Sequence, residues 1–193
     1  MVTAAEPSEQ VVRHLRVHLG DDPAWAEALD RLDARSGPAT SLHLAVMVEP
    51  FLGLLLAGAK TMESRFSRVR CAPWGVLNPG DVVVLKKTGG PITGAFVAGK
   101  VLSISLDPQD PNQIAAVRSH HAAAICATDE QFWVDRADTK VATLAEVTAV
   151  RAVPALPFAK KDRRGWVVLT STSAAGRWTD CGKAGQPELP WTS

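Results

Sequence analysis

Cysteine is scarce in this chain, and its spacing argues against two kinds of cross-link. The three cysteines, Cys71, Cys126 and Cys181, lie far apart and form no CxxC pair. An odd number of widely spaced thiols argues against a disulfide framework and against a structural zinc site. No metal and no cofactor are expected. Free thiols are typical of a reducing compartment, so a cytoplasmic location is expected.

Long hydrophobic runs are missing as well. The longest, Phe51 to Ala57, is far shorter than the roughly 20 residues that a membrane-spanning helix needs. Residues 1–10 contain no basic patch followed by an apolar stretch, which a signal peptide would show. The sequence therefore predicts neither a signal peptide nor a membrane partner.

Excess charge is the third absence, although the charges are unevenly distributed. The formal net charge is +1, which argues against avid, nonspecific binding to long nucleic acid. Residues 1–40 contain four arginines against seven acidic residues, a net charge of −3. A late segment is basic, with Lys160, Lys161, Arg163 and Arg164. This segment is compatible with phosphate contacts, but charge alone favours a solvated loop.

The first 38 residues have the pattern of amphipathic helices. Apolar residues recur three to four positions apart, and Asp22-Pro23 is a typical helix start. Ser36-Gly37-Pro38 then ends the helical pattern. We interpret residues 1–38 as a helical extension that either packs on the following domain or links it to a protein partner.

Residues 39–178 are expected to form the folded domain, and residues 179–193 a C-terminal tail. Short β-prone runs alternate here with turn signals and a few helical segments. The runs predict strands at 42–48, 61–66, 82–87, 92–106, 141–153 and 166–170. A helix is expected at 51–57, with Gly58 as its left-handed C-cap. A second is expected at 111–124, capped by Asp110. A third is expected to run to residue 133 from a capping box formed by Thr128 and Gln131. Gly94 and Gly99 indicate bends in the longest strand. This pattern predicts an α+β or small-barrel domain.

The densest group of polar residues follows the first of these inserted helices. Lys60 offers a mobile positive charge, and Arg65 offers a planar fork suited to phosphate or carboxylate. Glu63 can accept hydrogen bonds from a ligand or orient either cation. Because side chains alternate along a strand, Thr61, Glu63 and Arg65 are expected on one face. The alternative is an exposed charge pair worth about 0–1 kcal/mol.

This segment resembles the signature of the ASCH family (activating signal cointegrator homology). The family hallmark is GxKxxExR after a helix, and this sequence has Gly58, Lys60, Glu63 and Arg65 in that spacing. Flanking segments agree, including "NPGDVVVL", "TGGPITGAFVAGKV" and "RRGWVVL", so that the resemblance covers about residues 42–170. It implies an α+β, PUA-like small β-barrel with inserted helices. It also implies a cleft near the motif that binds RNA or a nucleotide-like small molecule.

The resemblance also leaves an enzymatic alternative open. Some family members look like amidohydrolases of acetylated cytidine that use a lysine, a threonine and a glutamate. Lys60 would match the lysine, but Glu63 stands at the threonine position. A carboxylate there would hold Lys60 charged, which is wrong for a lysine base. Other members are associated with RNA cleavage, for which Lys60 and Glu63 would be the catalytic residues. A protein-interaction module that recruits a partner through residues 1–38 is the third alternative.

Two further residues are candidates for ligand contacts. Trp74 lies in the loop after the motif strand, where it could stack on a base or simply pack over one end of the barrel. Lys86 follows a buried-type strand, where it could flank the cleft or form an ordinary charge at the end of a hairpin.

Overall fold

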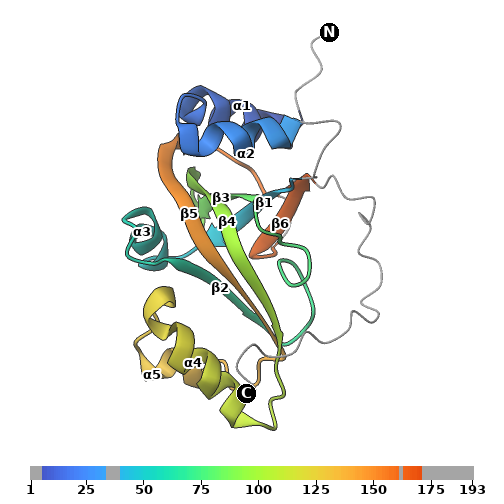
Figure 1. Cartoon of the computed structure of the whole chain (residues 1–193), viewed down its shortest axis with the longest axis vertical. Coiled ribbons are helices and arrows are strands. Elements are labelled where there is room, and N and C mark those ends of the chain that lie inside the picture. The colour runs from blue at the N-terminus through green and yellow to red at the C-terminus, as the bar shows by residue number, and fades with distance from the viewer. Residues whose placement is uncertain (1–5, 34–39, 161–162, 171–193) are drawn as a thin grey trace.

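One mixed β-sheet runs through the protein, with helices at both of its ends (Figure 1). The computed structural model describes residues 6–33, 40–160 and 163–170. Within them the strand order is β2-β5-β4-β3-β1-β6. The strands are β1 (Leu42–Met47), β2 (Met62–Ser67), β3 (Val82–Lys87), β4 (Ile92–Ser105), β5 (Val141–Leu156) and β6 (Trp166–Thr170). The pair β1–β3 is parallel, and the other pairs are antiparallel. The predicted α+β class is confirmed.

The two longest strands bend where the sequence predicts it. The pairing of β4 with β5 shifts register next to Gly94 and again between Ala98 and Val101. A Cβ atom at Gly94 would lie 2.4 Å from the Leu56 side chain and 2.9 Å from the Arg151 carbonyl oxygen. Only glycine therefore fits at this close approach. The bends curl the sheet around its core.

The curled sheet forms a half-barrel whose edges are not joined by a strand ladder. β2 and β6 lie at opposite ends of the strand order. Arg65 of β2 nevertheless donates hydrogen bonds to the carbonyl oxygens of Gly165, just before β6, and of Val46 in β1. A side chain thus bridges the two edges, where a closed barrel would have backbone pairing.

The N-terminal helices cover one end of this half-barrel (Figure 1). α1 (Pro7–Leu19) and α2 (Pro23–Asp33) bury their apolar faces against strand residues such as Leu44 and Val84. Trp25 is fully buried, and its indole N–H donates to the Ala149 carbonyl oxygen at 2.7 Å. Of the two alternatives for residues 1–38, the described part packs on the domain and shares its core.

The other three helices lie along β2 and at the opposite end of the sheet (Figure 1). They are α3 (Phe51–Leu56), α4 (Pro111–Ile125) and α5 (Glu130–Val134). Asp110 caps α4 as predicted, with its side chain accepting from the Asn112 N–H. The predicted capping box at Thr128 is wrong, because Asp129 caps α5 and the helix begins one residue later. No helix in the described part of the chain is long and apolar enough to span a membrane.

The last part of the predicted domain and the predicted tail, residues 171–193, lie outside the described residues. The boundary expected at residue 178 therefore stays a prediction.

Trp25→Ala is expected to lower the free energy of unfolding by about 3–5 kcal/mol, because it leaves a cavity between α2 and the sheet. Urea unfolding measures this. Val17→Ala on the exposed face of α1 is the control, with an expected change within about 0.5 kcal/mol. Equal midpoints for the two variants would show that the helices do not belong to the core.

Candidate functional site

A sharp turn brings the motif into the core. Gly58 follows α3 with φ +74°, a left-handed conformation that glycine adopts without strain. The backbone N–H of Lys60 then donates to the Leu54 carbonyl oxygen at 3.0 Å. The chain therefore enters β2 with the Lys60 side chain directed under the sheet, where it is 2% exposed.

Lys60, Glu63 and Arg65 form one connected ion cluster around the Glu63 carboxylate. The Lys60 ammonium lies 3.2 Å from Glu63 Oε2, and Arg65 Nε donates to Glu63 Oε1 at 2.8 Å. Lys60 also donates to the Met62 carbonyl oxygen. Glu63 is 3% exposed, so the reading of these residues as an exposed charge pair is wrong. We name Lys60, Glu63 and Arg65 the ion cluster.

Arg65 ties the ion cluster to the far edge of the sheet. Its two terminal nitrogens donate to Gly165 O at 3.3 Å and to Val46 O at 3.0 Å. Its guanidinium carbon lies 5.2 Å from the centre of the Trp166 ring, within cation–π range. With Nε on Glu63, most of the five N–H groups have partners inside the protein.

A buried polar chain holds Trp166 in place beneath Arg65. The Trp166 indole N–H donates to His43 Nδ1 at 3.1 Å, and His43 Nε2 lies 3.1 Å from Asp81 Oδ2. An indole nitrogen only donates, so His43 Nδ1 must accept and Nε2 must carry the proton. Asp81 also accepts from the backbone N–H groups of Ser41 and Asn78. Every member of this chain is thereby hydrogen-bonded.

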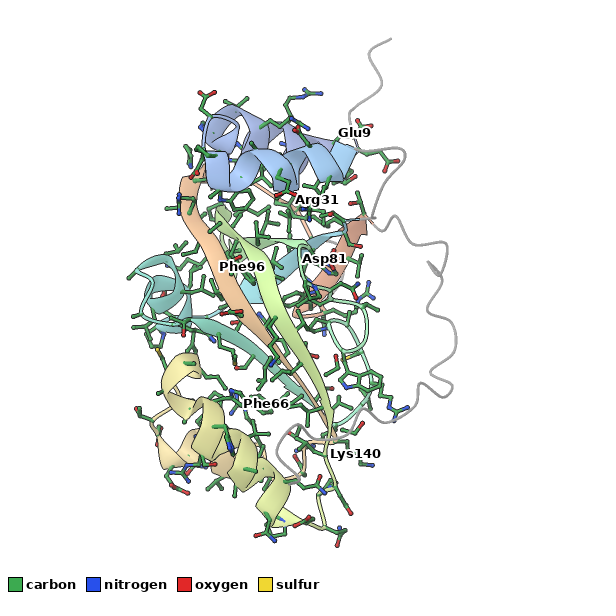
Figure 2. All side chains as sticks on the ribbon, in the orientation of Figure 1. Glu9, Arg31, Phe66, Asp81, Phe96 and Lys140 are labelled. Atoms are coloured by element: carbon green, nitrogen blue, oxygen red, sulfur yellow. The ribbon has the colours of Figure 1, made fainter. Side chains whose placement is uncertain are left out.

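A cavity of about 280 Å³, named the larger cavity, opens beside the ion cluster. Three phenylalanine rings stand around it, with the Phe132 ring centre 6.1 Å from that of Phe51 and 6.0 Å from that of Phe66. Phe66 lies near the α4–α5 end of the sheet (Figure 2). The lining consists of Val46, Met47, Val48, Phe51, Lys60, Glu63, Ser64, Arg65, Phe66, Phe132 and Arg136.

Arg136 is the main residue of this cavity that the sequence did not reveal. Its guanidinium carbon lies 3.5 Å from the Phe132 ring centre, and it donates to the Phe132 carbonyl oxygen at 2.6 Å. Burial lowers the pKa of Arg136, and the Asp135 charge partly opposes this. Arg136 follows α5 in a turn, and no local pattern links it to β2.

A smaller cavity of about 180 Å³ lies on the other side of Arg65. Arg65 and Phe66 line both cavities and so form the wall between them. The remaining lining residues are Ser67, Cys71, Ala72, Pro73, Trp74, Val141, Thr143, Gly165 and Trp166. Trp74 is thus at the site, although it is buried. The guanidinium carbon of Arg70 lies 4.7 Å from the centre of its ring.

Two predicted ligand contacts lie away from both cavities. Thr61 is exposed just before β2, where its backbone N–H donates to the Ala124 carbonyl oxygen. Lys86 is buried, and its ammonium donates to the carbonyl oxygens of Lys87 and Gly90 in the hairpin turn. Of the two alternatives for Lys86, the structure has the lysine at the end of a hairpin.

The late basic segment lies next to the smaller cavity. Lys160 donates to the Arg164 carbonyl oxygen at 2.5 Å, and Arg163 and Arg164 are exposed just before Gly165. Lys161 lies outside the described residues. Among the residues that are described, no three His, Cys, Asp or Glu side chains are placed to hold a metal ion.

Comparisons with known proteins give a structural likeness only. No protein-family profile matches the chain, and no curated protein matches its sequence. The chain is similar in structure to two mutant forms of the ASCH protein from Zymomonas mobilis. The first has a TM-score of 0.47 and 14% identity over 62% of this chain and 76% of that one. The second has a TM-score of 0.47 and 13% identity over 60% of this chain and 75% of that one.

The unsubstituted ASCH protein of the same organism gives a TM-score of 0.45 and 13% identity, over 58% of this chain and 70% of that one. The likeness is thus to structures of one protein and two of its mutants. At this level it does not define a function, which has to be argued from the site itself.

Glu63→Gln is expected to lower the free energy of unfolding by about 3–5 kcal/mol, because it leaves the buried Lys60 ammonium without a counter-charge. The matched control is Glu27→Gln, which breaks an exposed pair with Arg31 and should cost at most about 1 kcal/mol. Chemical denaturation of both variants checks the difference. If both variants lose at most about 1 kcal/mol in free energy of unfolding, the ion cluster is not an electrostatic unit.

Proposed function

We propose that this chain binds a nucleotide-like ligand or a short single-stranded RNA segment in the larger cavity. The observation that carries the proposal is the hydrogen-bonding character of the cavity, which presents donors above a group of aromatic rings. The resemblance of the motif residues to the ASCH signature supports the same class of ligand.

The hydrogen-bond donors available to a ligand are the N–H groups that have no partner inside the protein. Both Glu63 oxygens accept from the protein's own cations, so the carboxylate offers a ligand little. The Lys60 ammonium has two partners and three N–H groups, which leaves one donor. Arg136 uses one terminal nitrogen on Phe132 O. A ligand that fits must therefore bring acceptors, as phosphate oxygens and base carbonyls do.

The rings supply the second half of the recognition. Phe51, Phe66 and Phe132 line the cavity, and the Arg136 guanidinium lies on the Phe132 ring. Unstacked bases of single-stranded RNA typically stack on aromatic side chains and on arginine guanidinium planes. A planar base with acceptor atoms on its edge matches both features.

Charge indicates a compact ligand. Lys60, Arg65 and Arg136 outnumber Glu63 around the cavity, while the whole chain has a formal net charge of +1. Attraction for phosphate is therefore local. Arg163 and Arg164 would extend the phosphate contacts past Gly165, toward the smaller cavity.

The hydrolase alternative has less support from the geometry. Lys60 would have to act as a base, yet its two partners, the Glu63 carboxylate and the Met62 carbonyl oxygen, are both acceptors that suit an ammonium donor. The protein-interaction alternative would use residues 1–38, but the apolar faces of α1 and α2 pack on the chain's own sheet.

Fluorescence anisotropy of a short labelled single-stranded RNA, titrated between about 50 and 200 mM salt, tests the proposal. Arg136→Gln should weaken binding roughly tenfold or more and reduce the salt slope by about 0.7, the value for one lost phosphate contact. The charge-matched control is Arg118→Gln, which removes a cation of α4 that lies outside both cavities and pairs with Glu130.

The absence of RNA and mononucleotide binding by the wild-type chain would refute the proposal. Binding that Arg136→Gln and Arg118→Gln weaken equally would mean that the contact lies elsewhere. The same samples, run on a gel, report cleavage, and cleavage by the wild-type chain would favour the hydrolase alternative.

A further inference from the structure

The smaller cavity lies where the half-barrel is left open. α1 and α2 cover one end of the sheet, whereas residues Ala72, Pro73 and Trp74 lie over this cavity at the seam between β2 and β6. Mouths of β-barrels are common positions for ligand sites. Its volume of about 180 Å³ and the 280 Å³ of its neighbour together fall in the range of about 300–1,000 Å³ for small-molecule sites.

One polar group of this cavity lacks a partner of the kind that folded proteins normally supply. The Trp74 indole nitrogen is buried and has no hydrogen-bond partner among the described residues. A buried donor usually finds a partner, because leaving one unpaired is costly. Thr143, which is 3% exposed, adds a hydroxyl to the same lining. Both residues line this cavity.

The walls of the cavity are planar or apolar. Phe66, Pro73, Trp74 and Trp166 contribute them, and the Trp166 indole N–H is already used by His43. Arg65, which separates the two cavities, retains an N–H group on the nitrogen that binds Gly165 O. The chemistry of the larger cavity is thus repeated here, with donors set among rings.

We propose that the smaller cavity is a second nucleobase site, so that the ligand is two consecutive nucleotides with one base on each side of Arg65. This inference rests on the proposed function of the larger cavity. The linking phosphate would pass the Arg65 side chain, and Thr143 and Trp74 would donate to acceptors on the second base.

Binding of uridine 5′-monophosphate and of the dinucleotide pUpU to the full chain, measured by calorimetry, tests this inference. The dinucleotide should bind about 5- to 150-fold more tightly, the range for one additional stacked base. Thr143→Val and Trp74→Phe should each reduce this gain while the affinity for the mononucleotide stays the same.

These two variants distinguish binding from folding. Thr143→Val keeps the β-branched shape and nearly the same volume, so the fold should be retained. Trp74→Phe keeps an aromatic ring and removes the unpaired N–H group. A purely structural role would therefore not produce a selective loss of dinucleotide affinity.

Cys71 provides an independent readout, because it is exposed and lines the smaller cavity. Its alkylation rate, followed by mass spectrometry of the Cys71 peptide, should fall with pUpU and not with the mononucleotide. Cys126 is the internal control, since it lines neither cavity and its thiol donates to Ala59 O.

Each outcome bears on one of the two proposals. Equal affinities for the two ligands, or protection of Cys71 by the mononucleotide, would overturn the second base site and leave the larger cavity standing. If the higher affinity for the dinucleotide persists in both Thr143→Val and Trp74→Phe, the second base site is also overturned. If neither ligand binds, both proposals are wrong.

Discussion

The architecture of the site depends on one buried carboxylate. Glu63 stands between Lys60 and Arg65 and compensates both cations where water is largely excluded. Without that carboxylate, two positive charges would face each other beneath β2, and Arg65 would lose the partner that orients its fork. Arg65 in turn reaches Gly165 and Val46, which makes the ion cluster the link between the two edges of the half-barrel.

This arrangement changes how the motif residues are expected to act. Most hydrogen bonds of Lys60, Glu63 and Arg65 are made with one another and with backbone carbonyl oxygens. For the proposed ligand, their expected effect is then to shape the two cavities and to leave donors in them. Direct contacts would come mostly from residues outside the motif, such as Arg136, the phenylalanine rings and Thr143.

The two ends of the sheet have different roles because they are covered differently. α1 and α2 seal one end with a continuous apolar core that includes Trp25 and Leu29. At the seam between β2 and β6 the cover is thinner, and a polar chain from Asp81 through His43 to Trp166 supports the guanidinium of Arg65. Buried polar contacts are thus concentrated behind the cavities.

The sequence by itself determined the local elements, and tertiary structure decided the site. β3, the Asp110 cap and the left-handed Gly58 follow the predictions because turn, capping and alternation signals act over a few neighbouring residues. The burial of Lys60 and Glu63, and the places of Arg136 and Thr143, depend on the strand order, in which β2 meets β5 and the β6 edge curls back toward Arg65. Such contacts join segments far apart in the chain, and no local pattern encodes their distance.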